Sequence, residues 1–140
     1  MQSTENITLE RELENVRAYL TLVQADYTRK VEVVYDIQDT DVRLPALSLE
    51  PLVENAVKYG IGKDGGTITI SSFMQDGNHV IRVRDSGCSQ SEMTEKEIAR
   101  LGVGVDNTRK RLAMQCSGEL ILNIAMTGTT VDIIIPKTEV

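Results

Sequence analysis

The stretch LSLEPLVENAVKYG, residues 47–60, decides the fold of this 140-residue chain. Apolar residues recur at spacings of three, four, seven and eight from Leu49, which predicts an amphipathic helix with one face on the core. Glu54, Asn55 and Lys58 fall together on the opposite face. Taken alone, such a strip is most often a solvated helix face with one weak surface ion pair. A functional interpretation therefore needs other residues that converge on it.

Length and composition exclude several classes of protein. One domain with its own core is expected, because 41% hydrophobic and 26% charged residues is the balance of a globular chain. The net charge of −6 argues against non-specific nucleic-acid binding. Cys88 and Cys116 form neither a disulfide framework nor a metal-ligand spacing, which fits a reduced cytoplasmic setting. There is no membrane-length apolar run and no signal peptide, so a soluble chain is expected, compatible with a piece of a larger membrane protein.

The first part of the chain carries a helical stripe. Apolar residues alternate at spacings of four and three: Leu9, Leu13, Val16, Leu20, Val23 and Tyr27. They predict a helix over about residues 7–27, with Glu10, Glu12 and Glu14 near its positive N-terminal end. Two interpretations stay open. The stripe packs on the core of the domain, or it is the end of a longer coiled-coil or bundle arm.

Strand patterns fill most of the remaining sequence. β-Branched, alternating runs predict strands at residues 31–37, 67–73, 79–85, 119–125 and 129–136. QDGN, residues 75–78, predicts a hairpin turn, and the second half of residues 101–116 predicts a helix. Sequential antiparallel strands with grouped helices predict an α+β fold. It is a two-layer α/β sandwich with a mixed, mostly antiparallel sheet, covered on one face by helices, plus the N-terminal helix.

A carboxylate follows the strand at residues 79–85. Ile81 and Val83 share strand parity with Asp85, so the Asp85 side chain is expected to point toward the apolar layer at the strand's end. A buried carboxylate needs a hydrogen-bond donor, and the exocyclic amine of a purine is a suitable one. An aspartate that caps the turn before Ser86 is the open alternative.

A glycine pair precedes the last predicted helix. Gly102 and Gly104 are expected just ahead of that helix, where backbone amides approach a phosphate at the positive helix end. A single G-x-G is weak, and a flexible loop that runs into a helix cap is the alternative. Asn107, Arg109 and Arg111 follow, placed either to reach phosphate or to lie in solvent.

The order of these motifs resembles a known family. An Asn-bearing helix, D-x-G, G-x-G leading into a helix with N-x-R, and Gly128-Thr129-Thr130 before an apolar strand resemble the ATP-binding domain of the GHKL superfamily, the Bergerat fold. PLVENAVKYG and GVGVDNTRKRL resemble its LytS-like branch of bacterial sensor histidine kinases. Residues 1–30 resemble the end of that branch's dimerisation and phosphoacceptor region, and residues 31–140 resemble its ATP-binding domain.

The resemblance implies binding of ATP and Mg²⁺ by a defined set of residues: Asn55, Lys58, Asp85, Gly87, Gly102, Gly104, Asn107, Arg109 and Thr130. Asn55 would be the Mg²⁺ ligand. Glu54, the one candidate catalytic group, would lie next to the metal and its waters. Lys58 would contact phosphate. Asp85 would accept a hydrogen bond from the adenine N6 amine, and Gly87 would allow close approach of the base.

The other implied residues serve the phosphates and the base. Gly102 and Gly104 would lie beneath the phosphates, with Asn107 and Arg109 on the phosphate side. Thr130 would support the contact between Asp85 and adenine through a water. The phosphoacceptor histidine would lie outside this chain, in an upstream domain that in turn serves a response regulator.

Several positions depart from the family pattern. Ser89 stands where the second glycine of D-x-G-x-G is usual, and the expected nucleotide lid, residues 90–101, is short. Tyr59 replaces a common histidine, and Val105 replaces a common leucine. These departures bear on ATP affinity more than on the fold, because a serine held at positive φ adds strain of about 1 kcal/mol.

Three functions remain in competition at this point. Pro51 stands four residues before Asn55, where ATP-hydrolysing relatives place a glutamate, so phosphoryl transfer to a presented histidine leads. An ATP-hydrolysing switch is the second hypothesis. A degenerate module that dimerises or binds a partner without nucleotide is the third. His79 is expected to be an ordinary surface or edge histidine. The full protein is expected to be a membrane-anchored homodimer with this domain in the cytoplasm.

Overall fold

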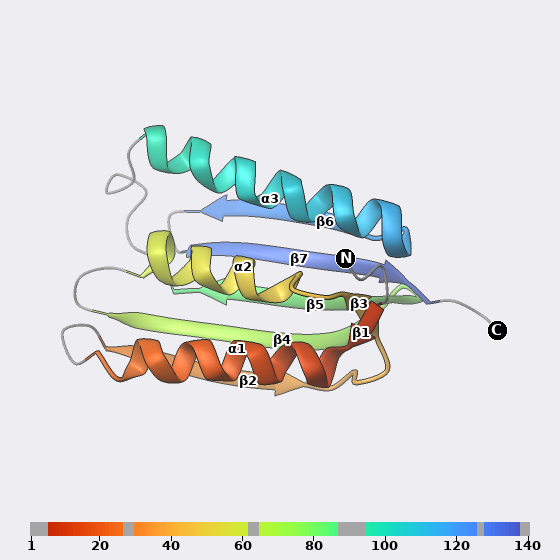
Figure 1. The fold of residues 1–140 in the computed structure, drawn as a ribbon, viewed down its shortest axis with the longest axis horizontal. Coiled ribbons are helices and arrows are strands. Elements are labelled where there is room, and N and C mark those ends of the chain that lie inside the picture. Colours follow the sequence, from red (N-terminus) through yellow and green to blue (C-terminus); the bar gives the residue numbers. More distant parts are fainter. Residues whose placement is uncertain (1–5, 27–29, 62–64, 87–94, 126–127, 138–140) are drawn as a thin grey trace, which may run out of the picture.

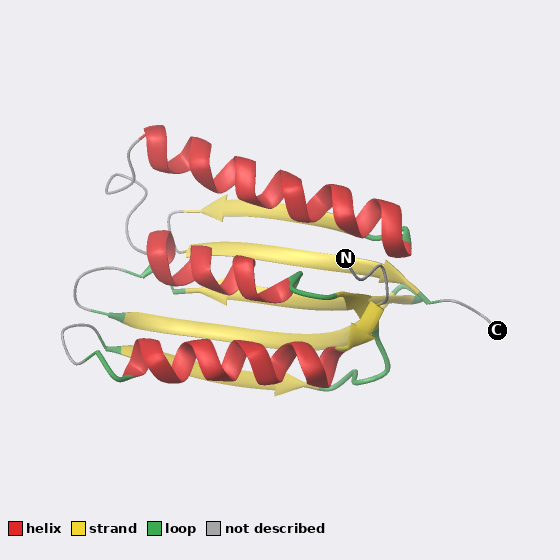
Figure 2. Cartoon of the chain, viewed as in Figure 1, coloured by secondary structure: helices red, strands yellow, loops and turns green. Residues whose placement is uncertain are grey.

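The computed structural model of the chain describes residues 6–26, 30–61, 65–86, 95–125 and 128–137, with the backbone alone for 95–104. The elements follow one another as β1 (Asn6–Thr8), α1 (Leu9–Gln24), β2 (Val31–Ile37), β3 (Arg43–Pro45), α2 (Leu49–Asn55), the π-helix η1 (Ala56–Gly60), β4 (Gly66–Gln75), β5 (Asn78–Asp85), α3 (Glu95–Cys116), β6 (Glu119–Ala125) and β7 (Gly128–Pro136). Figures 1 and 2 show that the helices all lie on one face of the main sheet.

The main sheet has five strands in the order β2-β4-β5-β7-β6. Only the β2–β4 pair is parallel, and the other three neighbouring pairs are antiparallel. The hairpin between β4 and β5 turns through Asp76 and Gly77, both at positive φ, as a two-residue type I′ turn requires. A second, two-stranded sheet joins β1 to β3. The predicted fold class, a mostly antiparallel sheet with helices on one face, is confirmed.

The first helix packs into the same core as the sheet. Leu9, Leu13, Val16 and Leu20 of α1 are buried and belong to one hydrophobic cluster with α2 and the inner faces of the strands. The interpretation of the stripe as a core-facing surface is therefore confirmed. The helix begins two residues later than predicted, because the preceding segment pairs with β3 and the Thr8 side chain caps the helix at the amide of Arg11. It ends at Gln24, short of the predicted residue 27.

The predicted start of the last helix is wrong. Helix α3 runs without a break over Glu95–Cys116, so Gly102 and Gly104 lie inside it rather than ahead of it. Each glycine costs a helix about 1 kcal/mol relative to alanine, and the helix-forming residues on both sides of the pair outweigh that cost. No helix in the described part of the chain is both long enough and apolar enough to cross a membrane.

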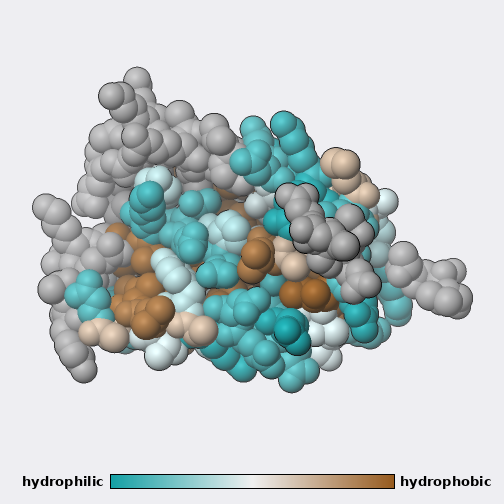
Figure 3. Space-filling view, in the orientation of Figure 1, coloured by the Kyte–Doolittle hydropathy of each residue, from teal (hydrophilic) through white to brown (hydrophobic). Residues whose placement is uncertain are grey.

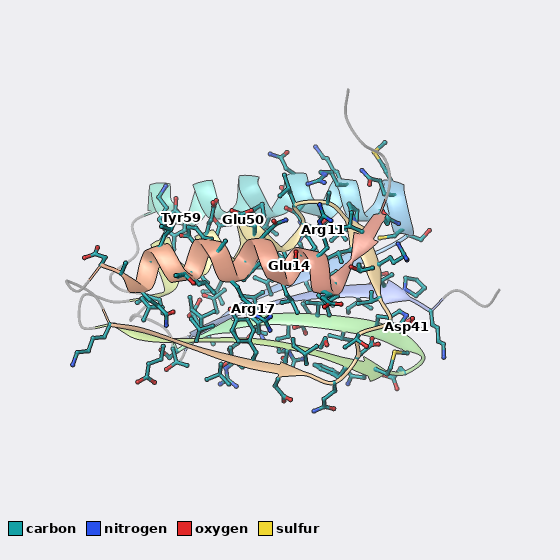
Figure 4. All side chains as sticks on the ribbon, turned by 60° about the horizontal axis from the view of Figure 1, so that its bottom comes forward. Arg11, Glu14, Arg17, Asp41, Glu50 and Tyr59 are labelled. Carbon is teal, nitrogen blue, oxygen red and sulfur yellow. The ribbon has the colours of Figure 1, made fainter. Side chains whose placement is uncertain are left out.

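Two surface features are visible from the helix side. Figure 3 shows a mainly polar face with an apolar patch at one end, where Leu22, Val23 and Val57 line a groove between α1 and η1. At the sheet edge the guanidinium of Arg17 on α1 lies 4.9 Å from the ring centroid of Tyr35 on β2, and Figure 4 shows Arg17 reaching toward the sheet. Burial raises the pKa of Tyr35, and the Arg17 charge opposes part of that shift.

Candidate functional site

Asp85 forms the floor of the candidate site. It ends β5, the central strand, and shares the inward parity of Ile81 and Val83, as predicted. The residue is only 2% exposed, and its Oδ1 accepts a hydrogen bond from the backbone amide of Thr129 at 3.0 Å. A carboxylate buried this deeply must be matched by donors, so its placement points to a ligand-binding role or to a dedicated structural one.

Two glycines lie directly against Asp85, one against its carboxylate and one against its backbone carbonyl. An ideal Cβ at Gly60, the last residue of η1, would lie 2.8 Å from Asp85 Oδ1 and would overlap Oδ2. At Gly128, where φ is +141°, a Cβ would overlap the carbonyl oxygen of Asp85. Both positions therefore need glycine, the first for space and the second for space and backbone conformation.

A small apolar pocket opens beside Asp85. Its lining joins α2 and η1 to β5 and β7: Leu52, Asn55, Ala56, Tyr59, Gly60, Val83, Asp85, Thr129 and Val131. The volume of this partly open pocket is about 10 Å³, roughly the space of a single water. A bound purine base therefore requires one wall of the pocket to move outward. The chemistry of the lining fits such a base, because apolar walls surround a single buried acceptor.

The polar strip of residues 54–58 divides into two parts. Asn55 is half-buried and lines the pocket, whereas Glu54 and Lys58 are exposed. The chain changes from α-helix to π-helix at Ala56, a local widening that recurs at functional sites. Among the described residues no ion pair joins Glu54 to Lys58, and the Lys58 ammonium lies 5.4 Å from the centroid of the Tyr59 ring instead.

Thr129, rather than Thr130, reaches the pocket. Strand parity explains this correction, because Thr129 shares the inward side of Val131 while Thr130 faces the open side of the sheet opposite Arg84. The expected role of Thr130 at the base is thus not supported by its position. Its neighbour contributes a backbone amide, which a side-chain motif does not reveal.

Arg109 of α3 is engaged within the protein. Asn107 is exposed, and half-buried Arg109 pairs with Asp106 and donates from Nε to the carbonyl oxygen of Leu120 at 3.3 Å. Their expected contact with phosphate stays a prediction, as do the roles of Gly102 and Gly104. Gly87 and Ser89 lie outside the described residues, as does the start of the expected lid, residues 90–94.

His79 is not the surface or edge histidine that was expected. It is 7% exposed on the central strand β5, and its Nδ1 lies 2.5 Å from Asp39 Oδ2. The register of β5 explains its burial, since residue 79, the second residue of the strand, shares the inward parity of Ile81 and lies directly opposite Ile135 of β7. The pair lies at the end of β5 remote from Asp85, so it belongs to the core rather than to the site.

Sequence reasoning missed Glu12. This carboxylate of α1 is fully buried and accepts hydrogen bonds from the backbone at the start of α2. A signal was present, because Glu12 falls three residues after Leu9 and four before Val16, on the apolar side of the helix.

A magnesium ion in this site would depend on few protein ligands. Among the residues that the structure describes, no group of three or more His, Cys, Asp or Glu side chains could hold a metal. Asn55 offers an amide oxygen at the pocket, with the Glu54 carboxylate beside it in sequence. This set fits Mg²⁺, which keeps several waters and takes substrate phosphate oxygens rather than an all-protein cage.

Comparison with known proteins places this geometry in a family. The profile described as histidine kinase-, DNA gyrase B-, and HSP90-like ATPase matches residues 40–139. The Bacillus subtilis (strain 168) protein YwpD is 35% identical over 150 aligned residues, covering 99% of this chain and 53% of YwpD. Sensor histidine kinase/phosphatase LytS of Staphylococcus aureus (strain Mu50) is 40% identical over 86 residues, covering 58% of this chain and 15% of LytS.

A solved structure shares the fold of this chain. The nucleotide-free catalytic domain of histidine kinase ThkA, 21% identical, has a TM-score of 0.70 over 97% of this chain and 98% of that chain. This chain spans about half the length of YwpD and a smaller share of LytS. The match to the profile confirms the family indicated by the motifs, and the similarity to LytS agrees with it: the chain belongs to the histidine kinase-, DNA gyrase B- and HSP90-like ATPases.

Proposed function

We propose that this chain binds Mg²⁺–ATP as the catalytic domain of a sensor histidine kinase and transfers the γ-phosphoryl group to a histidine outside the chain. The observation that carries the proposal is the buried Asp85 carboxylate, held against Gly60 at the floor of an apolar pocket. Family membership supports ATP as the ligand, and the buried acceptor supports adenine as its base.

The base would be recognised by Asp85. Its carboxylate accepts only, so it favours the exocyclic amine of adenine over the carbonyl that guanine carries at the same position. Val83 and Val131 supply apolar walls, and the absence of a side chain at Gly60 leaves the acceptor reachable from the pocket.

The phosphates would lie on the side of α2 and η1. Asn55 would hold Mg²⁺, Glu54 would orient its waters, and Lys58 would contact phosphate oxygens. When bound, the metal supplies neutralisation of phosphate charge. The exposure of Glu54 and Lys58 leaves both side chains available for these contacts.

Hydrolysis of ATP by water is the weaker alternative. Pro51 lies half-buried on α2 at the position of the general base in hydrolysing relatives, and proline has no group that accepts a proton. The degenerate-module alternative is favoured by one observation, the pocket volume of about 10 Å³. Nucleotide titration together with an assay of phosphate release separates all three.

The partners follow from the same proposal. The phosphoacceptor histidine would belong to an upstream domain of a longer, dimeric protein, and a response regulator would receive the phosphoryl group. A cytoplasmic position in a membrane-anchored kinase fits the length of LytS, of which this chain covers 15%.

Calorimetric titration with ADP, GDP and a non-hydrolysable ATP analogue, in Mg²⁺ and in EDTA, together with an assay of phosphate release from ATP, tests the proposal. Binding that requires Mg²⁺ and prefers adenine to guanine nucleotides supports it. Steady-state release of phosphate from ATP without an acceptor would instead indicate the hydrolysing switch. No heat up to about 1 mM nucleotide, a binding free energy weaker than about −4 kcal/mol, would leave the degenerate module as the function.

A further inference from the structure

Glu12 of α1 connects the first helix to the helix that carries Asn55. Its side chain is 0% exposed, and it accepts three backbone hydrogen bonds. Oε2 accepts from the amide of Leu47 at 3.0 Å, and Oε1 accepts from the amides of Ser48 at 2.8 Å and Leu49 at 3.0 Å. A carboxylate in this place also complements the positive end of α2.

Helix α2 depends on this carboxylate because it does not cap itself. Ser48 occupies the N-cap position, but its hydroxyl makes no capping hydrogen bond and instead donates to the carbonyl oxygen of Pro45 at 2.6 Å. Leu47 adopts φ of +61°, in the left-handed region. That turn directs three successive amides toward one point, and Glu12 occupies it.

The same segment is held from the other side by α3. Arg111 donates from Nη1 to the carbonyl oxygen of Leu47 at 3.3 Å and from Nη2 to the carbonyl oxygen of Ala46. Helix α1 thus accepts hydrogen bonds from the amides of residues 47–49, and helix α3 donates hydrogen bonds to the carbonyl oxygens of residues 46 and 47. Figure 4 shows α1 running alongside α2, on which Glu50 is labelled.

The N-terminal end of α2, which Glu12 holds, is one end of a continuous helical segment. Residues 49–60 continue from α2 into η1 without interruption, over roughly 17 Å. At the far end Gly60 meets the Asp85 carboxylate with no room for a Cβ. Asn55 lies between the two fixed points, so a shift or rotation at the Glu12 end changes where the Asn55 amide points.

We infer that Glu12 is a positioning residue of the nucleotide site, which sets the orientation of Asn55 through α2. The inference rests on the proposed function, since it assigns Glu12 a role in the metal-supported part of nucleotide binding. A helix cap with a purely structural role would change the stability of the fold and leave the ratio of affinities with and without Mg²⁺ unchanged.

The experiment compares Glu12→Gln with Glu10→Gln. The first variant keeps the volume of the side chain but replaces one acceptor oxygen by a donor facing backbone amides. The second removes an identical charge from an exposed position in the same helical turn. Each protein is titrated with a non-hydrolysable ATP analogue in Mg²⁺ and in EDTA. The titrations are made without urea, after circular dichroism has shown that the variant is folded.

Glu12→Gln should lower the affinity measured in Mg²⁺ by about tenfold, the usual effect of removing a group that orients a metal ligand, with little change in EDTA. The side-chain amide resonances of Asn55 should shift in this variant and stay in place in Glu10→Gln. If Glu12→Gln does not fold, Arg111→Gln replaces it, because it loosens the same segment from the side of α3.

Three outcomes decide the matter. A lowered urea midpoint with an unchanged ratio of affinities and unmoved Asn55 resonances overturns the inference and leaves Glu12 a helix cap. A wild-type chain that binds no nucleotide overturns the proposed function, and with it the role of Glu12 in binding. A loss confined to the Mg²⁺ titration supports both.

Discussion

The carboxylate of Asp85 has room in the core only because residue 60 carries no side chain: an ideal Cβ on Gly60 would lie 2.8 Å from Oδ1 and would overlap Oδ2. The two residues belong to different layers, one to η1 and the other to the central strand. Their contact fixes the distance between helix and sheet at the candidate site, so it sets the geometry of the pocket floor.

Gly60→Ala should therefore damage the site as well as the fold. The added methyl must displace either the carboxylate or η1, and overpacking of this kind costs about 1–3 kcal/mol of unfolding free energy. Nucleotide affinity should fall by more than about tenfold, since the acceptor for the base moves. Urea denaturation and calorimetry measure the two effects. Gly118→Ala is the control, because an ideal Cβ there would lie 3.2 Å from Cys116 Sγ and 3.3 Å from Ile134 O, in close contact but without the overlap found at Gly60. Equal affinity for Gly60→Ala and wild type would refute the contact.

Asp85→Asn should remove discrimination between adenine and guanine. The variant keeps an oxygen for the Thr129 amide, but its amide group now faces the N6 amine, donor against donor. Affinity for ATP should fall by roughly 1–3 kcal/mol, with a smaller effect on GTP. Competition calorimetry with both nucleotides measures this difference. An equal loss for the two would contradict recognition of the base by Asp85.

Asn55→Ala should abolish the dependence of nucleotide binding on Mg²⁺ while the chain stays folded. The side chain is half-buried at the pocket rim, so its truncation removes a ligand without opening a large cavity. Titrations in Mg²⁺ and in EDTA should then give the same affinity. Asn123→Ala, an exposed asparagine on β6, is the control and should behave as wild type. Persistent Mg²⁺ dependence in Asn55→Ala would assign the metal to another residue.

Cys116 should destabilise the fold at alkaline pH. Burial raises the pKa of its thiol above the ordinary value of 9.0, and the thiol donates to the carbonyl oxygen of Leu112 at 3.3 Å. As pH rises past 9.0 the unfolded chain ionises first, so the contribution of Cys116 is complete below that pH and is lost as pH approaches the raised pKa.

Cys116→Ser, in a Cys88→Ser background, should show a shallower alkaline loss of unfolding free energy than the background alone. Serine retains a hydroxyl donor for Leu112 but does not titrate in this range. Urea denaturation between about pH 8 and pH 10 measures the slopes, and the tyrosines contribute equally to both proteins. Identical slopes would mean that the thiol ionises as readily in the folded chain as in the unfolded one.

Most of the features of the fold and site that could be predicted from the sequence follow from the alternation of side chains along strands. The inward direction of Asp85 follows from its parity with Ile81 and Val83, which holds whatever surrounds the strand. The turn at Asp76 and Gly77 follows from local backbone preference in the same way. Such features depend on neighbours in the sequence, so the sequence alone suffices to predict them.

The errors have other origins. The prediction names Thr130, although Thr129 is the residue that shares the inward parity of Val131, and the role of Glu12 depends on how α1 lies against α2. The packing of one helix on another is not encoded within either element. The prediction that Gly102 and Gly104 precede the helix gives the glycine motif more weight than the helix-forming residues on both sides of it. In the structure the helix continues through both glycines. Long-range contacts thus decide the parts of the site that local patterns leave open.

The central position of β5 gives the two halves of the site unequal resistance to local unfolding. Asp85 ends a strand that is hydrogen-bonded along both edges, to β4 and to β7, while Asn55 lies on a short helix whose start is capped by the Glu12 side chain of α1. Backbone amides of β5 should exchange with solvent deuterium only when the whole domain opens, and those of α2 and η1 through smaller openings. The floor that recognises the base would then persist while the phosphate side opens to admit and release nucleotide.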